Sequence, residues 1–453
     1  MNTNEINFTD KKTLVVGLGV SGVAAAELLL SRGAHVWVTE EGSSDVLNKR
    51  ASDLETKGIK VEIGGHTEEF VLGAELIVVS PGVDHNDFLK KWPLCDGVPM
   101  IGELELGYLF CESPIIALTG TNGKSTTTEL IGNMFTISGR DTIVCGNIGN
   151  PLSGEIDSIS TDSVTVAEVS SFQLETMKAF RPHIAILLNV AEDHYDRHGG
   201  FDAYKEVKFR IFENQEASDW AIIHHSLISD PMIGKIKGRV LFYGAGGTAA
   251  YVDAGGDIVI DLNGKKKAVL NSAQVHLQGE HNLENITCSI LAAKILGLSD
   301  ENIKNGIASF KALYHRFESV GIFNGIEFID DSKATNIDAT RRALESVGKK
   351  VVLIAGGVDK GGDYTAILPV VKEKVKAMVA MGEARTKISE AYMGSLPVIL
   401  AENMADSIEK AVKQASDDEV VLLSPMCSSF DMYSSYKERG NDFQNKVREY
   451  FKQ

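Results

Sequence analysis

Short apolar runs alternate with helical stretches along the N-terminal part of the chain. Apolar or β-branched runs lie at 14–16, 35–39, 60–63 and 76–80, and an apolar-faced helix is expected over 23–30. Parallel strands joined by crossover helices produce this alternation. We therefore expect an α/β domain here, with a boundary near residues 111–114, where a new apolar run begins.

The middle of the chain predicts a second parallel sheet. Its strand candidates are almost wholly apolar, as strands buried on both faces are, and they cover 115–118, 142–145, 164–168, 183–189 and 220–223. Polar residues follow the first four runs, and the carboxyl ends of parallel strands meet at one edge of a sheet. We expect this edge to carry Lys124, Ser125, Asn147, Glu168, Asn189 and His194.

A third α/β unit is expected from residue 313. Before it, a patch rich in glycine and alanine (244–256) and the turn Asn263-Gly264 predict a small β insertion, followed by a helix over 282–296. The strands of the third unit are predicted at 326–329, 351–354, 377–381, 398–400 and 420–423. The expected domains are thus 1–111, 112–312 and 313–453, each with a mainly parallel sheet.

Composition excludes several classes of protein. With 45 Lys and Arg against 62 Asp and Glu, the net charge of -17 gives no basic footprint for general nucleic-acid binding. No apolar run approaches the ~20 residues that span a bilayer, and residues 1–12 lack the apolar stretch of a secretory signal. The five cysteines are scattered, as is typical of reduced thiols. We expect a cytoplasmic protein without membrane insertion.

The strongest chemical signal is the segment 119–126, which follows an apolar strand and opens a helix. Its glycines let backbone N–H groups surround a phosphate, Lys124 can neutralise β- and γ-phosphate charge, and the Ser125 hydroxyl can bind Mg²⁺. The match is to a shortened phosphate loop, GxxGKS. A glycine turn with a solvated lysine is the alternative, which the strand before and the helix after disfavour.

A second glycine motif lies in the first domain. Residues 17–22 read GxGxxG after a strand, with Glu40 and Glu41 after the next strand. This spacing is typical of a dinucleotide-type site with an acid near a ribose. A further loop, Ser80-Pro81-Gly82, follows the fourth strand. Together they indicate a nucleotide diphosphate, and they leave NAD(H) and a UDP-sugar both open.

An acidic group of residues points to a metal. Glu168 ends a strand, and Glu192, Asp193 and His194 follow another. Mg²⁺ prefers carboxylates, phosphate oxygens and water, with an occasional imidazole. Their shared edge with Lys124 favours a metal site over purely structural roles.

Two polar segments also fit plain helix capping. His281, Asn282 and Asn285 lie where a helix should begin, and the run 330–336 would form a turn that caps the helix after Asn336.

Taken together, these motifs resemble the Mur ligase family over residues 17–443. The blocks 120–125, 281–285 (HNLEN) and 315–318 (HRFE) occur in the order of that family. The segments 189–197, 331–336 and 423–429 are most similar to members that add D-glutamate to UDP-N-acetylmuramoyl-L-alanine.

The resemblance implies an ATP-dependent, amide-forming ligase of peptidoglycan precursor synthesis that works through an acyl phosphate. It implies a Rossmann-like N-terminal domain, a central P-loop ATPase domain and a Rossmann-like C-terminal domain. Its substrates would be ATP, D-glutamate and UDP-N-acetylmuramoyl-L-alanine. We expect a monomer.

The resemblance also implies roles for single residues. Those for ATP are Gly120, Thr121, Asn122, Gly123, Lys124, Ser125, Thr126, Asn285, Arg316 and Asp331. Those for the UDP-linked substrate are Val20, Ser21, Glu40, Glu41, Ser80, Gly82, Asn147 and Gln173, and which of the two glutamates contacts uracil stays open. Those for D-glutamate are Lys333, Thr335, Lys360, Ser429 and Tyr436, the last at a position where the family is expected to have Phe.

Catalysis would depend on Lys124, His194 and Lys208. Two Mg²⁺ ions would be held by Ser125, Glu168, His194 and Lys208. Lys208 would act as a carbamate, because an unmodified lysine is a cation and cannot serve as a carboxylate-like ligand.

Three other functions fit part of the sequence. A nicotinamide-dependent oxidoreductase would use the first domain but leave the loop 120–125 and the third domain unexplained. A related ligase would add another amino acid, as alanine-adding or folylpolyglutamate enzymes do. A regulatory P-loop ATPase would hydrolyse ATP without ligation.

Overall fold

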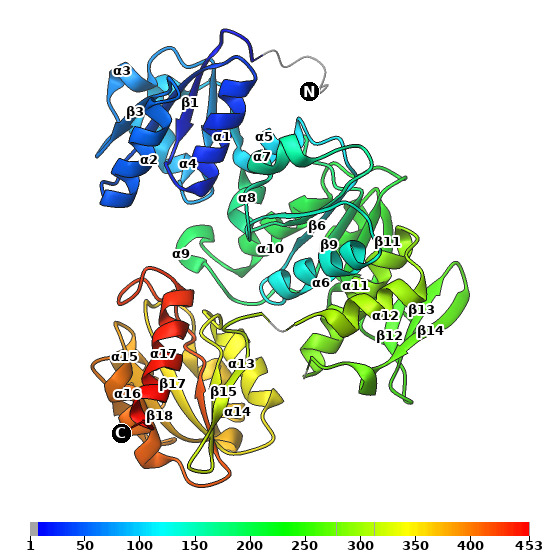
Figure 1. The fold of residues 1–453 in the computed structure, drawn as a ribbon, viewed down its shortest axis with the longest axis vertical. Helices are drawn as coiled ribbons and strands as arrows, with labels where there is room; N and C mark the ends of the chain where they lie inside the picture. Colours follow the sequence, from blue (N-terminus) through cyan, green and yellow to red (C-terminus); the bar gives the residue numbers. More distant parts are fainter. Residues whose placement is uncertain (1–7, 278, 312, 453) are drawn as a thin grey trace.

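A computed structural model describes residues 8–277, 279–311 and 313–452. The chain forms three β-sheets, in three successive parts of the sequence (Figure 1). Residues 1–7 lie outside the described residues; they belong to the segment that is expected to lack a secretory signal. Residue 312, at a predicted domain boundary, lies outside them as well. Within the described residues no helix is long and apolar enough to span a bilayer.

The first sheet is fully parallel, with strand order β3-β2-β1-β4-β5. Its strands are β1 (Lys12–Val16), β2 (His35–Glu40), β3 (Lys60–Ile63), β4 (Leu76–Val79) and β5 (Met100–Gly102). Its helices are α1 (Val20–Ser31), α2 (Asp45–Glu55), α3 (Glu68–Val71), α4 (His85–Lys91) and α5 (Glu103–Tyr108). The strand order reverses between β1 and β4, so both glycine loops of this domain leave the sheet at its switch point.

The turn after β1 requires glycine at Gly22. A Cβ there would lie 1.9 Å from the carbonyl oxygen of Gly17, which itself has φ +99°. Only glycines allow α1 to start so close to the strand.

The second sheet has nine strands in the order β14-β13-β12-β11-β10-β9-β6-β8-β7. The parallel strands are β6 (Ile115–Thr119), β7 (Thr142–Gly146), β8 (Val164–Glu168), β9 (Ile184–Leu187), β10 (Trp220–His224), β11 (Arg239–Tyr243) and β12 (Ala250–Val252). The predicted β insertion is the antiparallel hairpin of β13 (Asp257–Leu262) and β14 (Lys265–Asn271). Asn263 and Gly264 both have positive φ, as a two-residue hairpin turn requires.

Helices α6 (Lys124–Ile137), α11 (Glu280–Ile295) and α12 (Asp300–Ser309) pack against one another on this sheet. The remaining helices of this part are α7 (Leu152–Glu155), α8 (Ser171–Glu175), α9 (Tyr195–His198) and α10 (Phe201–Phe209).

The third sheet has the order β15-β16-β20-β17-β18-β19 and is parallel except for β15. Its strands are β15 (Glu318–Phe323), β16 (Ile326–Asp330), β17 (Val351–Gly356), β18 (Val375–Met381), β19 (Val398–Leu400) and β20 (Val420–Leu423). Its helices are α13 (Ile337–Ser346), α14 (Leu368–Lys374), α15 (Arg385–Ala391), α16 (Met404–Gln414) and α17 (Tyr436–Tyr450). Three mainly parallel α/β sheets confirm the expected fold class.

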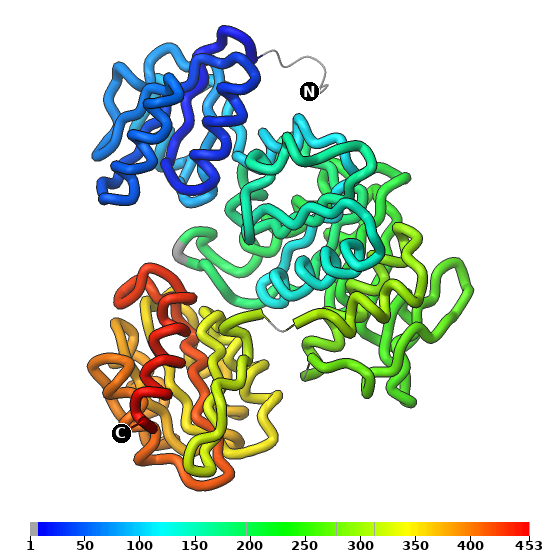
Figure 2. The backbone as a smooth tube through the Cα atoms, viewed as in Figure 1, coloured from blue at the N-terminus to red at the C-terminus, as the bar shows by residue number. Residues whose placement is uncertain are grey.

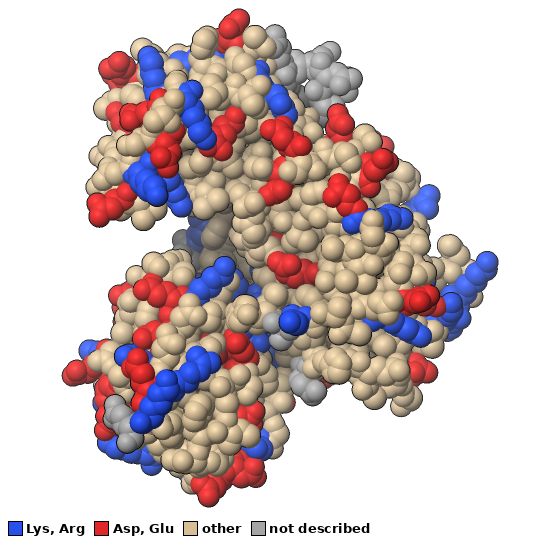
Figure 3. Space-filling model, in the orientation of Figure 1, with Lys and Arg blue, Asp and Glu red and all other residues tan. Residues whose placement is uncertain are grey.

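The surface carries both signs of charge, and it is hollowed between the N-terminal and C-terminal parts (Figure 3). The segment around α9, from the middle part, extends between these two parts (Figure 2). Its contacts tie all three parts together. Arg197 donates to the Val83 carbonyl (3.2 Å) in the first part, and Asp193 accepts from Lys360 (3.0 Å) in the third.

Candidate functional site

The phosphate loop leaves β6, an interior strand of the second sheet that lies between β9 and β8. The neighbouring strands run β7-β8-β6-β9, so the segments that follow these four strands lie side by side. Gly123, with φ +85°, precedes the first residue of α6, which is Lys124. The N-terminus of a helix with exposed N–H groups is a ready site for phosphate.

Two lysines meet at this loop, Lys208 buried and Lys124 half-buried. The Lys124 Nζ donates to the carbonyls of Gly120 (2.7 Å) and Thr121 (2.9 Å), and the Lys208 Nζ donates to Gly120 (2.9 Å). Burial lowers the pKa of both, and for Lys208 the nearby charge of Lys124 lowers the pKa further. The N–H donors of both amines converge on one carbonyl, and the positive charge at Lys124 favours an incoming anion beside them.

Glu168, at the end of β8, offers a metal ligand. It is 1% exposed, and its Oε1 accepts from the Asn147 amide (2.6 Å). Its Oε2 is buried and has no hydrogen-bond partner among the described residues. A buried carboxylate oxygen without a partner is costly, and a divalent cation would satisfy it. This observation fits a Mg²⁺ ion beside the loop.

Ser125 is already contacted by the C-terminal part. The Arg316 Nη2 donates to the Ser125 Oγ (2.8 Å), so the hydroxyl still has a lone pair for a metal. Arg316 therefore reaches the phosphate loop from the third sheet.

His194 lies in the left-handed region, with φ +53°, directly before α9. Its ring packs edge-on against Phe172 (4.9 Å) and lies 6.4 Å from the ring of Tyr204. The ammonium of Lys208 sits 4.4 Å above that same Tyr204 ring. Tyr204 is not predictable from the sequence, because one buried tyrosine in a helix carries no motif.

A cavity of about 100 Å³ lies between the second and third sheets. Its lining includes Gly123, Asn285, Arg316 and Asp331, all expected at ATP. Burial raises the pKa of Asp331 to about 7.

The capping interpretation of residues 281–285 is wrong. The helix α11 starts at Glu280 after Gly279, so His281, Asn282 and Asn285 lie inside it. The Asn285 side chain packs closely against the phosphate loop. A Cβ at Gly123 would lie 2.5 Å from the Asn285 Oδ1. The other capping prediction is confirmed, since Asn336 caps α13 by accepting from the Ala339 N–H (2.8 Å).

The residues expected at D-glutamate fall into two groups. The Lys333 ammonium lies 4.0 Å above the Tyr436 ring, and burial lowers its pKa to about 7. Ser429 is buried, and the Thr335 N–H donates to the Lys333 carbonyl. Lys360 instead forms an ion pair with Asp193 (3.0 Å).

A cavity of about 260 Å³ in the first domain is lined by Gly17, Glu40, Glu41 and Gly82, among others. Glu40 accepts from the backbone N–H groups of Leu18 (2.7 Å) and Gly42 (2.8 Å). Glu41 forms an exposed ion pair with Lys91 (2.9 Å), beside the cavity.

The remaining residues expected at the UDP-linked substrate have different surroundings. Val20 and Ser21 begin α1, and Val20 is 56% exposed. The Ser80 Oγ donates to the Gly17 carbonyl (3.2 Å) and so holds the turn. Gln173 completes a capping box with Ser170 at the start of α8, so it has a structural role besides the expected substrate contact.

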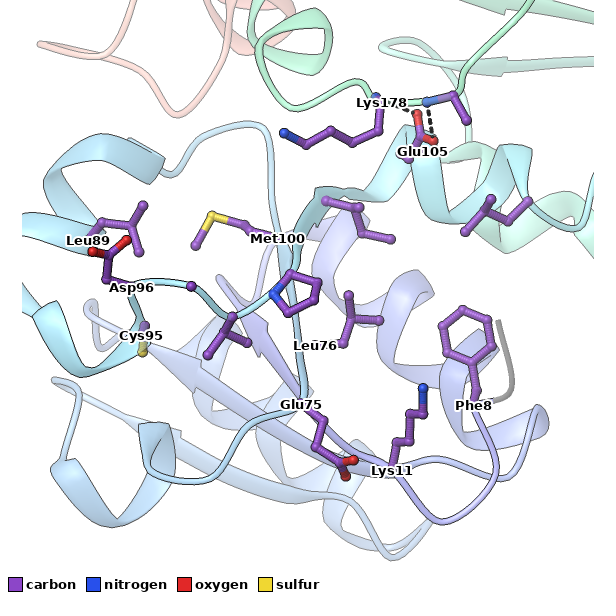
Figure 4. A pocket seen from close by; sticks show the side chains of 16 residues that line it. Phe8, Lys11, Glu75, Leu76, Leu89, Cys95, Asp96, Met100, Glu105 and Lys178 are labelled. Carbon is purple, nitrogen blue, oxygen red and sulfur yellow. Dashed lines mark hydrogen bonds between the residues drawn. The ribbon is translucent and has the colours of Figure 1, made fainter. Parts of the chain in front are cut away.

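A larger cavity lies elsewhere, with a volume of about 800 Å³ (Figure 4). It is mainly apolar, and it runs from Phe8 and Leu76 past Met100 to Lys178 of the middle part. None of the residues expected at a substrate lines it. Size alone therefore does not identify the reactive site in this molecule.

A phosphate loop faced by an arginine and an acid from another domain is typical of an enzyme that consumes a nucleoside triphosphate as its domains close. The comparisons with known proteins define the family. The model of the Mur ligase middle domain matches residues 118–293, that of the Mur ligase glutamate ligase domain matches 315–427, and that of the MurD-like N-terminal domain matches 11–102.

The chain belongs to the Mur ligase family. It is 43% identical to the UDP-N-acetylmuramoylalanine–D-glutamate ligase of Desulfosudis oleivorans, over 98% of this chain and 97% of the relative. It is 40% identical to the ligase of the same name from Pelotomaculum thermopropionicum, over 97% and 98%.

Solved structures agree on the fold. The UDP-N-acetylmuramate–alanine ligase of Thermotoga maritima matches with a TM-score of 0.60 and 19% identity, over 97% of this chain and 99% of that one. MurF of Acinetobacter baumannii matches with a TM-score of 0.62 and 16% identity, over 98% and 92%. The three-domain architecture implied by the resemblance is confirmed.

Proposed function

We propose that this chain is an ATP-dependent ligase that joins D-glutamate to UDP-N-acetylmuramoyl-L-alanine in peptidoglycan precursor synthesis. One observation carries the proposal: relatives named for this ligation are about 40% identical along nearly their whole length. All three domains are therefore matched, including the one in which the amino acid is expected to bind.

The reaction would have two steps. The alanyl carboxylate attacks the γ-phosphorus of ATP, which forms an acyl phosphate and releases ADP. The neutral amine of D-glutamate then attacks the acyl carbon, and the C–O bond to phosphate breaks. Lys124 and Arg316 would offset the charge that develops on the phosphoryl oxygens, in a site where burial strengthens their effect.

Ser125, Glu168, His194 and Lys208 would hold two Mg²⁺ ions, and bound Mg²⁺ supplies Lewis-acid stabilisation of phosphoryl oxygens. Lys208 would do so as a carbamate. Its buried amine is shifted toward the neutral form, and only a neutral amine can attack carbon dioxide. The amine loses a proton in that step, and the carbamate provides the oxygens that the lysine lacks.

The proposal extends to assembly, location and domain limits. We propose a cytoplasmic monomer with domains at 1–111, 112–312 and 313–453. Each limit falls between the sheets of successive parts of the chain.

The decisive experiment measures phosphate release with ATP, Mg²⁺ and UDP-N-acetylmuramoyl-L-alanine. The reaction should require D-glutamate, with neither L-glutamate nor the absence of an amino acid sufficient, and give a product of the corresponding mass. Activity with another amino acid would change the substrate, and release without any amino acid would leave only an ATPase. Tight NAD(H) binding in a titration would favour an oxidoreductase.

A site variant adds a second test. Lys124→Ala should lower the rate by at least about 10²- to 10³-fold, because it removes a cation aimed at the transferred phosphoryl group. The exposed Lys237→Ala is the matched control and should behave like the unaltered chain. A fully active Lys124→Ala variant would contradict the assignment of the phosphate loop.

A further inference from the structure

We propose that Asp338 is a positioning residue for the nucleotide loop, which it holds through the side chain of Asn122. The contact between Asp338 and Asn122 would then couple the docking of the C-terminal domain to the conformation of the phosphate loop, 119–126. The inference rests on the function proposed above, since it assigns the loop to ATP.

Asn122 sits at the tip of the loop, and all its polar groups are engaged. Its backbone N–H donates to the Asn189 Oδ1 (2.8 Å), and its carbonyl accepts from the Asn189 Nδ2 (3.0 Å). These two bonds hold the backbone of the loop from within the middle domain.

The side chain of Asn122 is held from the C-terminal domain instead. Its Nδ2 donates to the Asp338 Oδ2 (2.7 Å), and its Oδ1 accepts from the Asn336 Nδ2 (3.2 Å). An ionised carboxylate can only accept, so Asp338 fixes which end of the amide faces it. A hydrogen bond to a charged acceptor is also stronger than a neutral one.

Asp338 is itself rigidly placed. It lies in the first turn of α13 and is 15% exposed. Its Oδ1 accepts from Arg341 (2.6 Å) and its Oδ2 from Arg342 (2.9 Å). These two arginines fix the Asp338 carboxylate relative to α13. Its hydrogen bond to Asn122 therefore makes the position of the phosphate loop depend on the position of α13.

The helix that carries Asp338 also begins just after Asp331, expected at ATP, and Lys333 and Thr335, expected at D-glutamate. A shift of α13 would therefore change the amino-acid site and the tip of the nucleotide loop together. Lys124 follows Asn122 by two residues, and a misplacement of about 1 Å in a reacting site can cost about 100-fold in rate.

The test is a double-mutant cycle on the full-length enzyme, with D-glutamate-dependent phosphate release as the readout. Asp338→Ala should lower kcat/KM for ATP by about 10- to 100-fold, the effect expected for a hydrogen bond to a charged group. In the Asn122→Ala background the same change should cost less than about twofold, because the bond is already absent. An equal loss in both backgrounds would overturn the proposal.

Two further variants separate positioning from helix stability. Asp338→Asn keeps an acceptor for Asn122 but loses the charge that strengthens this bond and binds the arginines, so it should lower kcat/KM for ATP by less than Asp338→Ala does. Glu345→Ala removes another carboxylate partner of Arg341 on the same helix, and it should leave kcat/KM unchanged. A loss in Glu345→Ala as large as in Asp338→Ala would mean that only the helix matters. If the unaltered enzyme showed no D-glutamate dependence, the proposed function would fail, separately from this coupling.

Discussion

The two interfaces of the middle domain are built in opposite ways. The N-terminal domain shares one apolar cluster with it, in which residues such as Leu29, Leu106 and Leu152 are all fully buried. The helices α1 and α5 pack directly on α7. The helices come so close that a Cβ at Gly107 would lie 2.7 Å from the Leu152 Cγ and 2.9 Å from the Ser153 backbone nitrogen.

The C-terminal domain meets the middle domain through polar groups. In the described ranges, no apolar cluster includes residues from both sides of that boundary. The contacts are instead hydrogen bonds and ion pairs, such as Arg316 with Ser125 and Lys360 with Asp193. Water can replace such bonds at little net cost, whereas exposed apolar area cannot be compensated. We therefore expect the N-terminal interface to be fixed and the C-terminal one to open and close.

The largest effect should come from the apolar interface. Leu152→Ala removes a side chain that is 0% exposed, so we expect a loss of about 2–5 kcal/mol in the free energy of unfolding. Denaturant unfolding measures this loss, with Leu72→Ala, 57% exposed, as the matched control. A Leu152→Ala variant as stable as the control would show that this interface is not part of the core.

The polar interface should respond in the opposite direction, because Lys333 is largely withdrawn from water there and forms no ion pair with a described residue. Burial lowers the pKa of Lys333 to about 7 from its ordinary 10.5. Between these values the unfolded chain binds more protons than the folded one, so stability rises with pH from about 7 to 10. Lys333→Met should remove that rise and stabilise the protein near pH 7 by up to about 4 kcal/mol, at about 1.4 kcal/mol per pKa unit.

The same Lys333→Met variant should lose ligation, because the charge is expected to bind D-glutamate. Unfolding curves from pH 6 to 10 check the first part and phosphate release the second. Lys237→Met at the exposed surface is the control for both. If Lys333→Met kept the pH dependence of stability of the unaltered chain, Lys333 would not be the group whose titration causes it.

A smaller effect should follow from the ion pair across the polar interface. Lys360→Met leaves Asp193 with its hydrogen bond from Asn336 but without its ion pair to lysine. We therefore expect the contact between the middle and C-terminal domains to become weaker by about 1–3 kcal/mol. Small-angle scattering should then give a larger radius of gyration without substrates. Lys91→Met, whose ion pair lies within the first domain, should leave the radius unchanged. An unchanged radius in both variants would mean that this ion pair does not hold the domains closed.

This contrast also marks what the sequence could predict. Strands such as β6 and β17 are continuous apolar runs, and the loop 119–126 is a local motif, so both were visible from the chain alone. The edge strand β15 was missed, because its half-exposed residues mix polar and apolar types. Residues 170–173 read Ser-x-x-Gln, the signature of the capping box that Gln173 completes, whereas the resemblance implies a substrate contact for Gln173.

Contacts across the polar interface were not predictable in the same way. Asn122 and Asp338 are 216 positions apart, and Ser125 and Arg316 are 191 apart. No periodicity links such pairs, because only the docking of two separately folded sheets brings them together.

The smallest effect concerns Glu40 and Glu41, which the sequence left as alternatives for uracil. Both carboxylate oxygens of Glu40 are used by backbone N–H groups of the turn, while Glu41 is exposed beside the cavity. We therefore expect Glu41→Gln to leave the unfolding midpoint unchanged and to weaken binding of the UDP-linked substrate several-fold in a calorimetric titration. Glu40→Gln should instead lower stability, because both backbone N–H groups lose a charged acceptor and one of them faces an amide NH2 group, which cannot accept. If only Glu40→Gln weakened binding while its unfolding midpoint stayed in place, Glu40 would be the uracil contact and the turn would not depend on it.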